Sequence, residues 1–176
     1  MKKQLRYLTS LIVVAFALYG VFALVMSFQP SIAHAAGNES AQLQEDTPPT
    51  PRTPEELKDG LFINMTTDDI DRAAMAVGFA TKIRKQTGRP VTIFFNTQGV
   101  RLVDVDIPQS THKSGNTIHE MIQMFMDEGG VALVCPVCMV NVGGMETEDI
   151  LPGVIIGTPE FTWGALFAEN VTTLSY

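Results

Sequence analysis

The chain is 176 residues long and acidic, with 19 Asp and Glu against 12 Lys and Arg and a net charge of −7 at neutral pH. All the acidic residues lie after Ala35, and the nine basic and 19 acidic residues that follow it give −10. Because phosphate binding relies on clustered Lys and Arg, this balance argues against a nucleic-acid partner. No glycine-rich phosphate loop, Ser-His-Asp arrangement or pair of acid–base carboxylates stands out, which disfavours kinase and hydrolase chemistry.

Residues 1–36 have the pattern of a bacterial-type signal peptide or an N-terminal membrane anchor. Lys2, Lys3 and Arg6 precede the uncharged stretch 8–28, and Ala33-His34-Ala35 follows as a small-residue cleavage site. The stretch is long enough for a spanning helix, so an uncleaved anchor is the alternative to cleavage after Ala35. Both interpretations predict export, to the periplasm or to its face of the inner membrane, with membrane contact only through this segment.

Residues 37–59 are predicted to be a disordered linker. They are polar and contain Pro48, Pro49, Pro51 and Pro54, so they cannot bury enough apolar surface to offset the entropy of ordering. The rest of the chain, 60–176, falls in the usual size range for one domain.

Strand-like and helix-like patterns alternate along that domain. Apolar runs predict strands at 61–63, 91–95, 131–134, 154–156 and 171–174, and periodic apolar positions predict helices at 70–83, 118–125 and 159–168. Thr117 and Glu120 form a capping-box pattern, and Gly88 and Gly129 follow two of the helices. The alternation predicts a single α/β domain with a mostly parallel five-stranded sheet flanked by helices, whose sites lie at the carboxyl ends of the strands.

The two cysteines occupy such a carboxyl end, in the segment Cys135-Pro136-Val137-Cys138 after the strand 131–134. A short helix is predicted from Cys138 through Val142. Backbone N–H groups at a helix start stabilise an anion, so we expect a lowered thiol pKa. A disulfide closing so short a loop would add little stability, which favours reactive thiols over a structural staple. We predict Cys135 as the nucleophile and Cys138 as a resolving thiol.

A family resemblance is carried by several short motifs in order. They are Phe94-Phe95 with Gly99-Val100, Gly130-Val131-Ala132-Leu133 leading to Cys135 and Gly143, and Gly164-Ala165-Leu166. From about Leu61 to Tyr176 the chain resembles the DsrE/DsrF-like sulfur-relay family. The resemblance implies a subunit that carries sulfur as a persulfide on Cys135, with Cys138 as an additional thiol, within a homo- or hetero-oligomer.

The same resemblance implies a sulfur donor or acceptor protein, or a small thiol, as the partner. It implies no cofactor, and a carrier rather than a conventional turnover enzyme. The relays of this family are cytoplasmic, whereas the N-terminus here predicts export. An oxidising compartment favours reversible Cys135–Cys138 disulfide chemistry or capture of a thiophilic metal.

Two other interpretations concern the same segment. A thioredoxin fold would place a long helix, a strand and a second helix between Cys138 and Pro159, and only 20 residues lie there. A soft-metal site for copper or zinc is the alternative function. Its ligands would be Cys135, Cys138 and Met139, with Met145, His112 and His119 as weaker candidates. The long polar loop 104–116 is a candidate cover for the cysteine site or an oligomer contact.

Overall fold

The computed structural model describes residues 49–176. The predicted signal or anchor and residues 37–48 of the predicted linker lie outside this range, so the structure does not test them. Among the described residues, no helix combines the length and the apolar character needed to cross a membrane.

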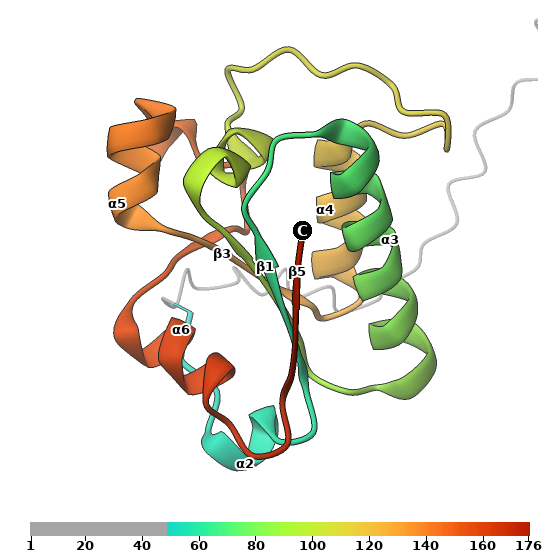
Figure 1. Cartoon of the computed structure of the whole chain (residues 1–176), viewed down its shortest axis with the longest axis vertical. Coiled ribbons are helices and arrows are strands. Elements are labelled where there is room, and N and C mark those ends of the chain that lie inside the picture. The colour runs from blue at the N-terminus through green and yellow to red at the C-terminus, as the bar shows by residue number, and fades with distance from the viewer. Residues whose placement is uncertain (1–48) are drawn as a thin grey trace, which may run out of the picture. The chain divides into compact units, whose positions relative to one another are not determined.

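The domain is built on one five-stranded sheet in which every neighbouring pair of strands is parallel (Figure 1). This confirms the predicted fold class. The spatial order is β4-β3-β2-β1-β5, so the last strand joins the sheet beside the first. The strands are β1 (Leu61–Met65), β2 (Val91–Phe95), β3 (Val131–Val134), β4 (Ile155–Ile156) and β5 (Thr172–Ser175).

One short helix precedes the first strand, and further helical segments lie between the strands. The α-helices are α2 (Pro54–Leu57), α3 (Ile70–Thr87), α4 (Ile118–Asp127), α5 (Pro136–Cys138) and α6 (Pro159–Leu166). Two 3-10 segments, η1 (Thr97–Val103) and η3 (Thr147–Asp149), and one π-helical turn, η2 (Met139–Gly143), complete them. The capping box of Thr117 and Glu120 is present, and Gly88 ends α3 in the left-handed conformation with φ 67°.

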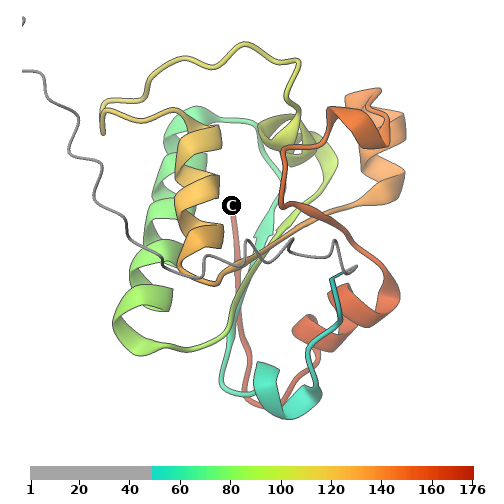
Figure 2. The same cartoon turned by 180° about the vertical axis from the view of Figure 1, so that it is seen from behind.

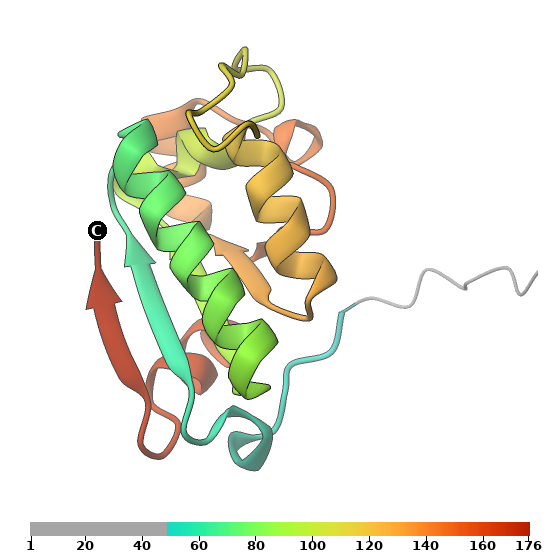
Figure 3. The ribbon, with the colours of Figure 1, turned by 90° about the vertical axis from the view of Figure 1, so that its right-hand side faces the viewer.

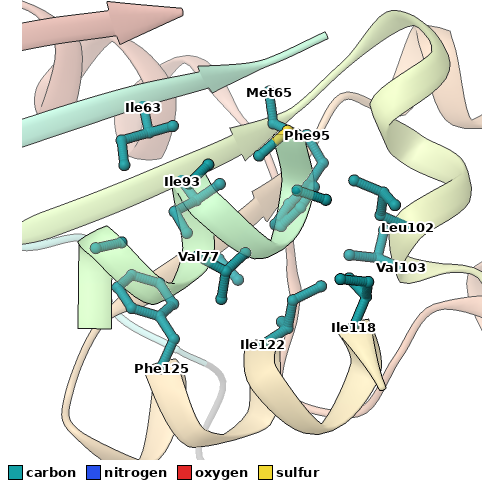
Figure 4. Packing of buried hydrophobic residues seen from close by; sticks show 14 of the residues in the cluster. Ile63, Met65, Val77, Ile93, Phe95, Leu102, Val103, Ile118, Ile122 and Phe125 are labelled. Atoms are coloured by element: carbon teal, nitrogen blue, oxygen red, sulfur yellow. The ribbon is translucent and has the colours of Figure 1, made fainter. Parts of the chain in front are cut away.

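Helices α3 and α4 lie side by side over one face of the sheet and form the larger core (Figure 2). Ala73, Ala76 and Ala80 are fully buried on α3, and small side chains let this helix approach the sheet closely. Phe125 and Ile122 of α4 belong to this core, and their side chains point from α4 toward α3 and the sheet (Figure 4). A Cβ on Gly130 would lie 2.2 Å from the Phe125 ring, so the glycine before β3 makes room for it.

The opposite face carries α2 and α6 over a much smaller core of Leu57, Phe62 and Ala165. The predicted linker was wrong at its carboxyl end, because residues 54–57 form a helix. Thr53 and Glu56 cap that helix reciprocally, and Leu57 is buried against the sheet. Burial of Leu57 and the capping box therefore order a segment whose polar, proline-rich composition predicts a disordered linker.

Candidate functional site

Cys135 directly extends β3 at the carboxyl end of the sheet. Its backbone N–H donates to the Phe95 carbonyl oxygen at 2.9 Å, so the ladder between β2 and β3 continues to this residue. Gly157 N–H donates to the Val134 carbonyl at 2.8 Å on the other side. The position of the thiol at a strand end is as the sequence predicts.

The helix after Cys135 begins earlier than predicted. It starts at Pro136 rather than at Cys138, and Cys135 itself is the N-cap. Proline suits the first helical position because that N–H has no partner within the helix. Cys138 therefore lies in the first turn. Its backbone N–H donates to Cys135 Sγ at 3.4 Å, and both cysteines are free thiols with partly buried side chains.

The electrostatics of Cys135 differ from the expectation for a helix start. Burial raises the pKa of the Cys135 thiol above its ordinary value, and the Cys138 side chain raises it further. The N–H groups of Cys138 and Val137 oppose this rise only in part. The predicted lowering of the pKa is thus wrong in sign. A three-residue helix aligns few peptide dipoles, and desolvation of the thiolate outweighs them.

After α5 the chain continues as the π-helical turn η2, which ends at Gly144 in the left-handed conformation with a φ of 69°. Met139 and Met145 are buried in the main core, at 5% and 2% exposed. A Cβ on Gly143 would lie 2.8 Å from Met145 Sδ, so this glycine lets Met145 pack under the turn. Val137 and Val140 point outward on the same segment and are exposed.

The predicted soft-metal ligands are not brought together as a set. Met139 packs in the core, His112 pairs with Asp71 at 3.3 Å, and His119 lies near Asp104. Across residues 49–176, no group of three or more His, Cys, Asp and Glu side chains could hold a metal ion. The metal interpretation is left with the two thiols alone, which supply half of a tetrahedral site.

The loop 104–116 is fastened to the helical layer. Asp104 is buried and forms an isolated antiparallel β-bridge with Ile150. The contact of His112 with Asp71 holds the loop against the start of α3 (Figure 3). The Nε2 atom of His119 is buried without a hydrogen-bond partner, and burial lowers the pKa of this histidine.

A group of polar side chains beside the cysteine was not predicted from the sequence. Asn64 Nδ2 donates to Ser175 Oγ at 3.5 Å, and Asn96 Nδ2 donates to Asn64 Oδ1, which links β5, β1 and the residue after β2. Asn96 follows β2 as Cys135 follows β3, and the parallel register makes them neighbours. The available signal was a polar residue at the end of each apolar run.

The comparisons with known proteins agree with this architecture. The model of the DsrE/DsrF-like family matches residues 60–164, which is more than half of the chain. The chain belongs to the DsrE/DsrF-like family. The resemblance drawn from the motifs around Cys135 is therefore confirmed.

Two solved structures share the fold. One is the ychN protein from E. coli, with a TM-score of 0.53 and 19% identity, covering 66% of this chain and 99% of that one. The other is MTH1491 from Methanobacterium thermoautotrophicum, a protein of unknown function, with a TM-score of 0.52 and 13% identity, covering 66% and 98%. A comparison with curated proteins gives no significant match. At these identities the likeness concerns the fold alone.

Proposed function

We propose that this protein carries sulfur as a persulfide on Cys135, with Cys138 as the second thiol, and that it does so outside the cytoplasm. The observation that supports this most directly is the placement of Cys135 at the carboxyl end of a central parallel strand, with Cys138 donating to its sulfur. Membership of a family whose fold serves sulfur relay is consistent with that role. The lysine and alanine pattern of residues 1–36 supports export.

The loading step is a thiol exchange at sulfur. The Cys135 thiolate attacks the outer sulfur of a donor persulfide, R–S–SH, so that a new S–S bond forms at Cys135 and the donor leaves as the thiolate R–S⁻. No net oxidation occurs, because one sulfur–sulfur bond replaces another. Since the raised pKa keeps the resting Cys135 protonated, a base on the donor or a higher pH is needed to form the nucleophile.

Two routes lead from the loaded state. An acceptor thiolate takes the outer sulfur and regenerates the Cys135 thiolate. Alternatively, the Cys138 thiolate attacks Cys135 Sγ and forms the Cys135–Cys138 disulfide. The bond between Cys135 Sγ and the outer sulfur breaks, and the outer sulfur leaves with its electron pair as HS⁻. The second route converts a sulfur carrier into a redox pair. Its support is the placement of the two thiols within one turn.

Intact-mass spectrometry of the protein isolated from its native compartment tests the proposal. We expect the mass of a chain that begins at Ala36. A fraction of the protein should be heavier by one sulfur atom, and treatment with a reductant should remove this added sulfur. Cys135→Ser should abolish loading from a small persulfide donor, whereas Cys138→Ser should load normally and accumulate the persulfide. Loading that persists in Cys135→Ser contradicts the assignment, and an intact Met1 on membrane-bound protein replaces cleavage with anchoring.

A further inference from the structure

We propose that the side-chain carboxamide of Asn96 binds the outer sulfur of a persulfide on Cys135. The side chains of Asn64 and Ser175 support Asn96 as a row of hydrogen-bonded groups. This role rests on the persulfide chemistry proposed for Cys135, and it gives the carrier a residue that distinguishes its loaded state from its empty one.

Asn96 and Cys135 occupy equivalent positions on adjacent strands. Phe95 pairs with Val134 in the parallel register, so the next residues along the two strands are Asn96 and Cys135. The Cys135 N–H donates to the Phe95 carbonyl oxygen at 2.9 Å, which extends the ladder to this level. Adjacent strands lie about 4.8 Å apart, so the two side chains start as neighbours.

Both side chains leave the sheet on the same face. The backbone is still extended at each residue, with φ and ψ of −143° and 174° at Asn96 and −71° and 114° at Cys135. Successive side chains of an extended strand alternate between faces. Phe95 and Val134 belong to the larger core, so the residues that follow them face the side of α6. A group attached to Cys135 Sγ therefore projects over the face that carries the Asn96 carboxamide.

The backbone of Asn96 is fixed on both sides. Its N–H donates to the Met65 carbonyl oxygen, and its carbonyl oxygen accepts from the Gly99 N–H, each at 2.9 Å. A Cβ on Gly99 would overlap the Met65 carbonyl oxygen, so glycine lets η1 begin this close to the end of β1. The carboxamide is thus held in position before sulfur is loaded.

Asn96 is the member of a polar row that lies nearest to Cys135. Its Nδ2 donates to Asn64 Oδ1 and, at 3.4 Å, to the Phe94 carbonyl oxygen. Asn64 Nδ2 donates in turn to Ser175 Oγ at 3.5 Å. Since β5, β1, β2 and β3 are consecutive in the sheet, the row crosses the carboxyl ends of three strands and ends beside the cysteine.

The row is able to present either an acceptor or a donor to sulfur. A carboxamide carries both kinds of group, and a hydroxyl both donates and accepts. In the direction described above, Asn96 donates away from Cys135 and keeps its oxygen for an S–H group. In the reverse direction, Ser175 donates to Asn64 and Asn64 donates to Asn96. Asn96 Nδ2 is then left to donate to an anionic sulfur, and every member of the row keeps a partner.

The contact is selective for the loaded carrier. Among residues 49–176, the hydrogen bond to Cys135 Sγ comes from the Cys138 N–H at 3.4 Å, and Asn96 makes none with this atom. A persulfide adds a second sulfur about 2 Å beyond Sγ. This outer sulfur carries the proton or the charge of the group, and it comes within reach of a carboxamide on the adjacent strand. Asn96 therefore stabilises the persulfide relative to the free thiol.

Sulfur exchange at equilibrium tests this role. The full chain with Cys138→Ser, which closes the resolving route, is equilibrated with glutathione persulfide and glutathione, and intact-mass spectrometry gives the loaded fraction. Asn96→Ala in that chain should lower the equilibrium constant for loading by about tenfold, the effect of one hydrogen bond to a charged group. Asn96→Asp keeps the size of the side chain but removes its N–H donors, and it should lower loading at least as much.

Alkylation of the empty carrier separates a contact with the outer sulfur from a structural effect. Because Asn96 does not bond the free thiol, the pH profile of Cys135 labelling should be the same with and without Asn96→Ala. Ser175→Ala removes only the far end of the row and should give a smaller loss of loading. Gln123→Glu is the matched control, since it makes the same change from amide to carboxylate on α4, over the opposite face, and should leave loading unchanged.

The outcomes keep this role apart from the proposed function. A Cys138→Ser chain that takes up no sulfur contradicts the proposed function itself. A chain that loads equally well with Asn96→Ala and Asn96→Asp overturns the role of Asn96 and leaves the carrier function standing. A change in labelling of the empty thiol as large as the change in loading would also overturn it, because the effect would then be structural.

Discussion

The two faces of the sheet are covered very differently. Under α3 and α4, fully buried side chains from β1, β2, both helices and η1 form one continuous core. Under α2 and α6, the cluster of buried hydrophobic residues consists of Leu57, Phe62 and Ala165, and Trp163 of α6 and Phe167 just after it are largely exposed. Since burial of apolar area is the main source of stability, the first face holds the fold together.

The unequal cores can be tested by removing one large side chain from each. Phe125→Ala should lower the free energy of unfolding by about 3–5 kcal/mol, because it empties a fully buried site. Leu57→Ala should cost about 2 kcal/mol, since the four-residue helix that carries it can relax around the loss. Chemical denaturation measures both.

Met124→Ala, at a half-exposed position next to Phe125 on α4, serves as the control for helix propensity and should change stability by less than about 1 kcal/mol. Equal losses of unfolding free energy for Phe125→Ala and Leu57→Ala would show that the two faces of the sheet contribute equally to stability.

A second test addresses the partly buried thiol at the end of β3. Because burial raises the pKa of Cys135, its alkylation should be slow at neutral pH and should increase as pH rises past the ordinary thiol value of about 8.5. Peptide mass spectrometry separates its labelling from that of Cys138. The urea-unfolded chain, in which both thiols are solvated, is the reference. Rapid labelling of native Cys135 at neutral pH would contradict the dominance of desolvation.

The same shift has a consequence for stability. The native state holds the Cys135 proton more tightly than the unfolded chain does, so the thiol favours folding below its unfolded pKa, and this contribution is lost as pH rises through the folded value.

The smallest expected effect concerns His119, a residue in the first turn of α4 that lies near Leu102 and Asp104 at the end of η1. Burial lowers the pKa of His119, although the nearby Asp104 carboxylate opposes the shift. Protonation is therefore less favourable in the native state than in the unfolded chain. Stability should be fully present above the unfolded histidine pKa of about 6.5 and should decline as pH falls below it.

His119→Gln should flatten that decline, as measured by unfolding at several pH values on the acidic side of neutrality. His112→Gln is the comparison, because His112 contacts Asp71 at the surface of the loop. An unchanged slope in His119→Gln would assign the acid sensitivity to other groups.

The sequence alone determined the order of the elements and the position of the thiol. Apolar runs bounded by glycine and the capping box of Thr117 and Glu120 are local features, so the strands 91–95 and 131–134 and the helix after Thr117 could be recognised without tertiary contacts. The placement of Cys135 after a central strand followed from the same pattern. The family resemblance rested on short motifs that these elements carry.

Only the tertiary structure decided properties that depend on distant neighbours. Leu57 is ordered because Phe62 and Ala165 lie opposite it, which no local signal in a proline-rich segment reveals. The pKa of Cys135 is raised because desolvation by the surrounding fold exceeds what one turn of helix supplies. The polar contacts of Asn64 with Asn96 and with Ser175 follow from the strand order, which places β1 between β2 and β5. Such properties arise from contacts between residues far apart in the chain, and the spacing of apolar residues along the sequence does not predict them.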